Sequence, residues 1–78
     1  MTVDEAIRWI AELFEEPNGN LRLETPRSEI VAWDSLGVLT LMARLDEDFD
    51  ILLTEEQLQN LRSVQDVIAA MRDHGAIV

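Results

Sequence analysis

Apolar residues recur at helical spacing in four stretches of the chain, and no stretch shows the alternation of apolar and polar residues that is typical of a strand. The first stretch predicts a helix over about residues 3–16. Thr2 before it and Glu5 three residues later have the pattern of a capping box, and the run Pro17-Asn18-Gly19 is expected to end it. The apolar residues on one face of this helix are Val3, Ile7, Ile10 and Phe14.

A second helix is predicted to begin at Asp34, an N-cap residue, and to run to about residue 48 or 49. Leu41 and Leu45 widen its apolar stripe, whereas Val38 is expected near or on its exposed side. Its apolar positions at roughly helical spacing are Leu36, Leu39, Met42 or Ala43, and Phe49.

Two shorter helices are predicted in the last third of the chain. The third begins after Thr54, with Gln57 as the partner in its capping box. The fourth begins after Ser63, with Asp66 at its third position and Gly75 as its C-cap. The inner face of the fourth helix is expected to consist of Val64, Val67, Ile68 and Met71.

A long connection over residues 20–33 separates the first two helices and contains Pro26. Loops of this length in compact domains tend to be functional or packed by their own side chains, and the apolar anchors here are Leu21, Leu23, Ile30 and Trp33. A chain of 78 residues suffices for one domain and is too short for two. We therefore expect residues 1–78 to form a single all-α domain. Its fold is a small four-helix bundle with three longer helices, one short helix and a long loop between helices 1 and 2.

The charge of the chain restricts the class of partner. Sixteen acidic and six basic residues give a net charge of −10. Nucleic acid would be repelled by such a surface, so we exclude it as a partner. The same charge steers proteins with basic patches toward the chain, or it simply keeps a small domain soluble, and the sequence leaves both interpretations open.

The composition also bears on the compartment. With no cysteine, the chain contains no disulfide and no thiolate metal site. Its longest apolar stretch is far shorter than the ~20 residues of a membrane span. Asp4 and Glu5 lie where a signal peptide carries positive charge. We therefore expect a monomeric cytoplasmic protein without a membrane span.

The side chains present argue against an enzyme and against a calcium loop. His74, near the end of the chain, is the single histidine and has no evident partner for a serine triad. Asp46, Asp48 and Asp50 alternate as in an EF-hand, but Ile51 stands at the glycine position and Gln57 at that of the bidentate glutamate. We expect no metal site and no catalytic residue.

Ser35 has the most informative position in the chain. It is predicted to lie in the first turn of the second helix, where backbone N–H groups lack partners within the helix. A phosphate ester there would meet those donors and the positive end of the helix dipole. A serine beside an Asp N-cap is also ordinary at a helix start, so this position alone does not establish a function.

The segment Trp33-Asp34-Ser35-Leu36-Gly37 is similar to an Asp-Ser-Leu attachment motif preceded by tryptophan. It is followed by an acidic stretch at 45–51, a Thr-Glu-Glu at 54–56, and a Ser-Val-Gln-Asp-Val-Ile at 63–68. In this order and at these distances, the segments resemble the acyl carrier protein family. The resemblance covers residues 30–72 well and the first helix more loosely.

The resemblance implies a carrier that is not itself an enzyme. A phosphopantetheinyl transferase with Mg²⁺ would transfer 4′-phosphopantetheine from coenzyme A to Ser35, and the arm's thiol would hold acyl or aminoacyl groups as thioesters. Asp34 would fix the presentation of the serine, and Leu36 would provide an apolar contact for the transferase. The alternative is an unmodified acidic helical domain for protein interactions.

The resemblance also implies partners and a pathway class. Acyl or aminoacyl ligases, synthases and transferases with basic docking patches would bind the acidic residues Asp46, Glu47, Asp48, Glu55 and Glu56, with Asp34 a further candidate. Relative to members from fatty acid synthesis, Gly37, Val38, Thr40 and Arg44 make the second helix less acidic, and Gly37 lowers its helix propensity by about 1 kcal/mol. We therefore expect a specialised lipid, polyketide or peptide-type pathway, with peptidyl and D-alanyl carriers fitting nearly as well.

The resemblance further implies that an acyl chain could be sheltered in a channel among the helices. The alternative is a fully packed core. The residues that would line the channel are Leu39, Met42, Ala43, Ile51, Leu58, Leu61 and Val64.

Overall fold

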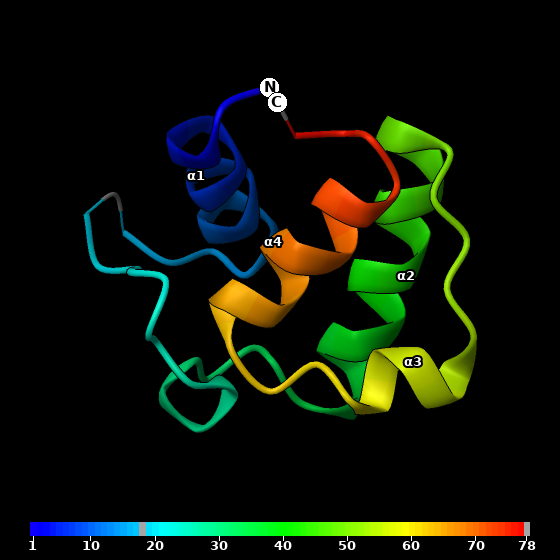
Figure 1. Ribbon diagram of the computed structural model, residues 1–78. Coiled ribbons are helices and arrows are strands. Elements are labelled where there is room, and N and C mark those ends of the chain that lie inside the picture. Colours follow the sequence, from blue (N-terminus) through cyan, green and yellow to red (C-terminus); the bar gives the residue numbers. More distant parts are fainter. Residues whose placement is uncertain (18, 78) are drawn as a thin grey trace.

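Helices and connecting loops make up the whole of the described chain. The structure is a computed structural model that describes residues 1–17 and 19–77. Its helices are α1 (Val3–Leu13), the short 3₁₀ helix η1 (Arg27–Glu29), α2 (Ser35–Phe49), α3 (Glu55–Gln59) and α4 (Val64–Asp73). The all-α class, with three longer helices, one short helix and a long loop before α2, is thus confirmed (Figure 1). None of the described helices has the length and apolar character needed to cross a bilayer.

Each of the four α-helices begins at a side chain that binds its first turn, as the sequence predicted. The oxygens of the caps accept hydrogen bonds from the backbone N–H three residues later, at 2.9 to 3.2 Å, and the caps are Thr2, Asp34, Thr54 and Ser63. In α1 the box is reciprocal because Glu5 accepts from the backbone N–H of Thr2, which lowers the pKa of Glu5. The start of each α-helix is therefore determined locally.

The end of α1 differs from the prediction. The helix stops at Leu13, before the Pro17-Asn18-Gly19 run, of which Asn18 lies outside the described residues. Glu15 adopts the left-handed conformation (φ 57°), and the N–H of Glu16 donates to the carbonyl of Ala11 at 2.8 Å. This closure is usually made by glycine, so no residue type marked it. α4 does end with the usual glycine, because Gly75 lies shortly after Asp73 and adopts the left-handed conformation (φ 80°).

The core lies where α1 packs against α4 and α2, and α2 packs against α3 (Figure 1). The inner face predicted for α4 is confirmed: its four residues are at most 2% exposed. Burying each aliphatic side chain of this size contributes about 1.5–3 kcal/mol. The large side chains with the least exposure are Ile10, Leu41, Leu45, Leu58, Val64, Val67 and Met71.

The buried face predicted for α2 was partly wrong, although Leu41 and Leu45 are buried as the sequence predicted. Val38 is 4% exposed and belongs to the core, whereas Leu36 and Leu39 are 73% and 56% exposed. Apolar residues cover so much of this helix that two stripes fit its spacing, one through Leu36 and Leu39 and one through Val38, Leu41 and Leu45. Periodicity did not distinguish the two stripes, and packing against the rest of the bundle selects the second.

The contact that decides this orientation joins the long loop to the first turn of α2. Gly37 is buried there, and a Cβ at this position would overlap the carbonyl oxygen of Ala32 and lie 3.3 Å from the Phe14 ring. Beside it, Trp33 is 3% exposed and its ring stacks on Phe14, with centroids 5.2 Å apart. Gly37 therefore lets the loop approach the helix closely. The expectation that the loop is packed by its own side chains is confirmed.

A second contact joins α1 to the far end of α2. The indole Nε1 of Trp9 donates to Oδ2 of Asp48 at 2.7 Å, and Arg44 forms an ion pair with the same oxygen at 3.1 Å. The Trp9 hydrogen bond lowers the pKa of Asp48, burial opposes this, and the Arg44 hydrogen bond adds to the lowering. The Trp9 and Phe49 rings meet edge to face at 5.0 Å. Asp48 thus links the two helices.

We predict that Gly37→Ala destabilises the fold by about 1–3 kcal/mol, as overpacking does. The loss arises although alanine improves helix propensity by about 1 kcal/mol, because the added methyl group displaces the Ala32 carbonyl. Urea unfolding followed by circular dichroism measures it. Thr40→Ala, at an exposed position of the same helix, is the matched control and should change stability by less than about 0.5 kcal/mol. A Gly37→Ala protein as stable as the wild type would contradict this packing.

We predict that Asp48→Asn lowers the thermal midpoint at pH 7. The pKa of Asp48 is depressed in the folded state, so its stabilisation is present above the ordinary carboxyl pKa of about 3.9. That stabilisation is lost as the pH falls through the folded value. The midpoints of wild type and variant should therefore converge as the pH falls below about 4 and through the folded-state pKa of Asp48. Asp46→Asn, which removes an exposed charge from the same helix, is the control; a pH-independent difference for Asp48→Asn would refute the linkage.

Candidate functional site

Ser35 is the first residue of α2 and is exposed. The N–H of Gly37 donates to the Asp34 carboxylate at 2.9 Å, and that of Val38 donates to the Asp34 carbonyl. Within the described chain, the N–H groups of Ser35 and Leu36 find no acceptor. Two backbone donors are therefore free at the positive end of a 15-residue helix, next to an accessible hydroxyl.

The arrangement is suited to holding a phosphoryl group. Backbone N–H groups at a helix start bind anions without a basic side chain. Catalysis by the chain itself finds no support, because the exposed His74 follows α4, whose end is far from the start of α2 in the fold (Figure 1). The hydroxyl thus has a binding environment, and the single histidine of the chain is far from it.

The three residues predicted around the attachment position lie together at the start of α2. Asp34, Ser35 and Leu36 are all exposed. Beside them is a surface pocket of about 290 Å³, whose lining includes Phe14 and Thr40. Leu36 is accessible for apolar contact because the orientation of α2 turns it outward, whereas the sequence pattern had counted it in the helix's apolar stripe.

The predicted acidic residues fall into two groups. Asp46, Glu47 and Asp48 lie in the last turns of α2, roughly 15–20 Å from Ser35 at 1.5 Å per residue. Glu55 and Glu56 begin α3, which lies alongside α2 (Figure 1). All five are exposed. The structure therefore places the first group far from the serine, whereas α3, with the second group, lies beside the end of α2 at which Ser35 is found (Figure 1).

Asp48 differs from the other acidic residues because its carboxylate is already bound by Trp9 and Arg44. The alternation of Asp46, Asp48 and Asp50 also loses its resemblance to a calcium loop, since the first two belong to a helix and Asp50 is its left-handed C-cap. Among the described residues, no group of three potential ligands is arranged to hold a metal ion.

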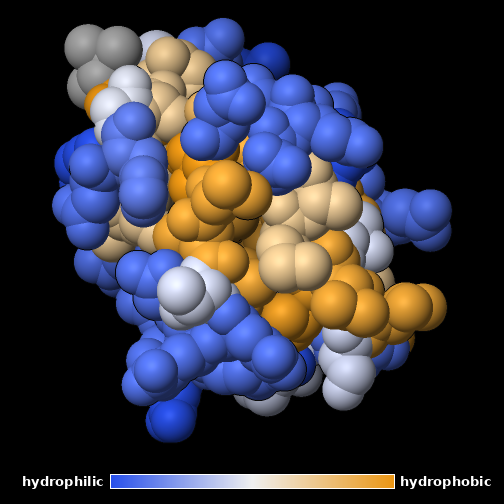
Figure 2. Space-filling view, turned by 90° about the vertical axis from the view of Figure 1, so that its right-hand side faces the viewer, coloured by the Kyte–Doolittle hydropathy of each residue, from blue (hydrophilic) through white to orange (hydrophobic). Residues whose placement is uncertain are grey.

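The face of the molecule on the α2 side carries a broad hydrophobic area with hydrophilic residues around it (Figure 2). The large apolar residues most exposed in the described chain are Val31, Leu36, Leu39 and Leu52. Two of them belong to α2 itself and Leu52 follows it. This surface is a consequence of the orientation of α2 and was not anticipated from the pattern.

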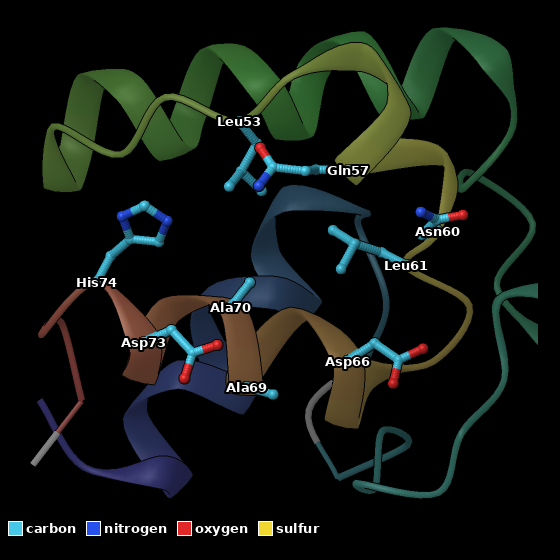
Figure 3. Close-up of a pocket in the computed structure, with 9 residues that line it drawn as sticks. All are labelled: Leu53, Gln57, Asn60, Leu61, Asp66, Ala69, Ala70, Asp73 and His74. Atoms are coloured by element: carbon cyan, nitrogen blue, oxygen red, sulfur yellow. The ribbon is translucent and has the colours of Figure 1, made fainter.

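A separate pocket of about 370 Å³ lies between α4 and the α3 region (Figure 3). Leu53, Gln57 and Leu61 line one side, and Ala70 and His74 the other. Of the seven residues expected for an acyl channel, only Leu61 borders this pocket. Ile51, Leu58 and Val64 are packed in the core, and Leu39 and Ala43 are exposed.

Gly37 has a packing role that the sequence did not predict. The absence of a side chain at this position lets the loop approach the first turn of α2 just before Ser35. A glycine inside a helical pattern, three residues after the N-cap, is itself a signal of a close backbone approach.

Comparison with known proteins agrees with this geometry. A family model described as "Phosphopantetheine attachment site" matches residues 7–71. The chain is 29% identical to an acyl carrier protein of Kocuria rhizophila, with 83% of this chain and 85% of that protein covered. It is 27% identical to an acyl carrier protein of Phytoplasma mali, with 85% and 79% covered. No solved structure matches significantly. The match over most of the chain shows that it belongs to the acyl carrier protein family, whose members are non-catalytic carriers with a 4′-phosphopantetheine prosthetic group.

Proposed function

We propose that Ser35 carries the 4′-phosphopantetheine arm and that the chain presents acyl or aminoacyl thioesters to partner enzymes. The observation that carries this proposal is an exposed hydroxyl in the first turn of α2, beside two backbone N–H groups without acceptors. It lies inside the matched residues 7–71. When bound, the arm supplies the thiol that a cysteine-free chain lacks.

The chain's own residues have distinct tasks in this proposal. The Ser35 oxygen forms the ester, and the N–H groups of Ser35 and Leu36 stabilise the phosphoryl oxygens. Asp34 keeps the first turn in place through its bond to Gly37. A phosphopantetheinyl transferase supplies the base and the Mg²⁺.

The exposed acidic residues favour partners with basic docking patches. Asp46, Glu47, Glu55 and Glu56 are available for them, while Asp48 is held by Trp9 and Arg44. Each exposed ion pair contributes about 0–1 kcal/mol, so several together set the on-rate and orientation. The exposed Leu36 and Leu39 add apolar area on the same helix. Ligases, synthases and transferases that handle thioesters are the partner class.

The proposed pathway is a specialised lipid, polyketide or peptide-type one. Of the four residues that suggested it, Gly37 and Val38 are buried and do not alter the recognition surface. Thr40 is exposed and Arg44 is paired with Asp48, so these two carry the proposal. An unmodified interaction domain remains the rival function, and it would bind partners regardless of Ser35.

We predict that coenzyme A, Mg²⁺ and a broad-specificity phosphopantetheinyl transferase add one phosphopantetheine mass to the wild type and none to Ser35→Ala. Intact-protein mass spectrometry measures the addition. Ser28→Ala removes another exposed hydroxyl and should still be labelled. A folded wild type that gains no mass, or label on Ser35→Ala, would count against the assignment.

We predict that Glu47→Gln combined with Glu55→Gln lowers kcat/KM for this labelling by about two- to tenfold at low salt. The loss should shrink as salt screens the pairing. Glu12→Gln with Glu24→Gln removes the same charge from exposed positions outside α2 and α3 and is the control. Equal losses for the two double variants would mean that net charge alone matters.

A further inference from the structure

A pocket of about 600 Å³ under the long loop differs from the rest of this acidic molecule. Its lining contains two arginines, Arg27 and Arg62, and no carboxylate. Each of the other four pockets described includes at least one aspartate or glutamate. The chain has six basic and sixteen acidic residues. A pocket lined by two cationic side chains and no anionic one therefore has the opposite charge to the molecule as a whole.

Tertiary contacts bring the two arginines together from positions 35 apart in the sequence. The backbone N–H of Arg27 donates to the carbonyl of Arg62 at 2.7 Å, and an isolated antiparallel bridge joins the neighbouring Pro26 and Ser63. The carboxylate nearest in sequence to Arg62, that of Asp66, accepts from the backbone N–H of Arg62 at 2.9 Å. The backbone thus holds both arginines at one pocket.

The guanidinium groups are available for a ligand. Arg27 uses its Nε to donate to the Trp33 carbonyl at 2.9 Å, and its Cζ lies 5.9 Å from the centre of the Trp33 ring. These contacts orient the side chain and leave its terminal guanidinium nitrogens without a hydrogen-bond acceptor among the described residues. Arg62 is exposed. Within the described chain, neither arginine forms an ion pair. Arginine is well suited to phosphate and carboxylate because its planar group donates two parallel hydrogen bonds.

The rest of the pocket combines apolar and donor groups. Ile30, Val31 and Trp33 provide apolar surface, and Ser28 provides a hydroxyl. The Trp33 Nε1 is buried and has no hydrogen-bond partner among the described residues, which is uncommon for an indole in a folded protein. The lining therefore suits an anionic group joined to an apolar or extended chain.

The pocket lies close to the candidate attachment position. Arg27 is bonded to the carbonyl of Trp33, which is two residues before Ser35. We propose that this pocket binds a phosphate or carboxylate group, which is either the phosphodiester that joins the arm to Ser35 of the same chain, contacted also by the N–H groups of Ser35 and Leu36, or part of a molecule in solution such as coenzyme A. Anion binding by the pocket is independent of the modification, and only delivery by the arm rests on the proposed function.

The two tryptophans make the test direct. In the unmodified protein, inorganic phosphate is titrated at constant ionic strength while the indole N–H resonances are followed by NMR. The Trp33 resonance is expected to shift to saturation. The Trp9 resonance should stay in place, because its N–H is bonded to Asp48 at the other end of α2.

Variants then assign the site. Arg27→Gln and Arg62→Gln should each weaken phosphate binding by about tenfold, the worth of one charge-assisted hydrogen bond. Arg72→Gln, in α4 and outside the pocket, should leave it unchanged. Absence of a saturable Trp33 shift, or an undiminished shift in both pocket variants, would overturn the proposal.

The source of the anion is distinguished with the phosphopantetheinylated protein. If the arm delivers the group, the Trp33 resonance of the modified protein already differs from that of the unmodified one, and phosphate moves it less. If the group comes from solution, both forms titrate alike, and coenzyme A replaces phosphate as the tighter ligand. Failure of Ser35 to be labelled would leave the titration of the unmodified protein fully interpretable.

Discussion

The close approach of the Ala32 carbonyl to Gly37 governs the rest of the structure. Because no side chain separates them, the long loop lies directly on the first turn of α2, and Trp33 can stack on Phe14. This contact rotates α2 so that Val38, Leu41 and Leu45 enter the core. The opposite side of the helix, with Leu36 and Leu39, is thereby exposed. One backbone contact thus links the packing of the core to the apolar surface beside Ser35.

The charges of the molecule are divided in a way that suits a carrier. Acidic side chains are exposed in the last turns of α2 and at the start of α3, where the proposed partners would bring positive charge. Arg27 and Arg62 reverse this pattern in one pocket near the start of α2. In the two proposals, the acidic residues attract partner proteins at long range, and the pocket binds a small anionic group at short range. The two can operate together because they lie on different elements.

Local rules account for what could be predicted and for what could not. Helix starts depend on a cap and the third residue after it, so Thr2, Asp34, Thr54 and Ser63 were all identified correctly. The end of α1 was missed because Glu15, which is not a residue favoured in the left-handed region, closes it. The face of α2 was misassigned because its apolar residues fit two stripes, and the loop that chooses between them approaches from residues outside the helix.

The sequence alone determined the helical class, the caps, the acidity and the resemblance to acyl carrier proteins around Ser35, since each depends on residues that are neighbours in the chain. Only the tertiary structure decided which leucines are exposed, that Asp48 is held by Trp9, and that Arg27 meets Arg62. The last two depend on pairs of residues more than thirty positions apart, and the first depends on the loop before α2 and on the rest of the core. Their proximity follows from how the helices share one core, and no local pattern encodes it.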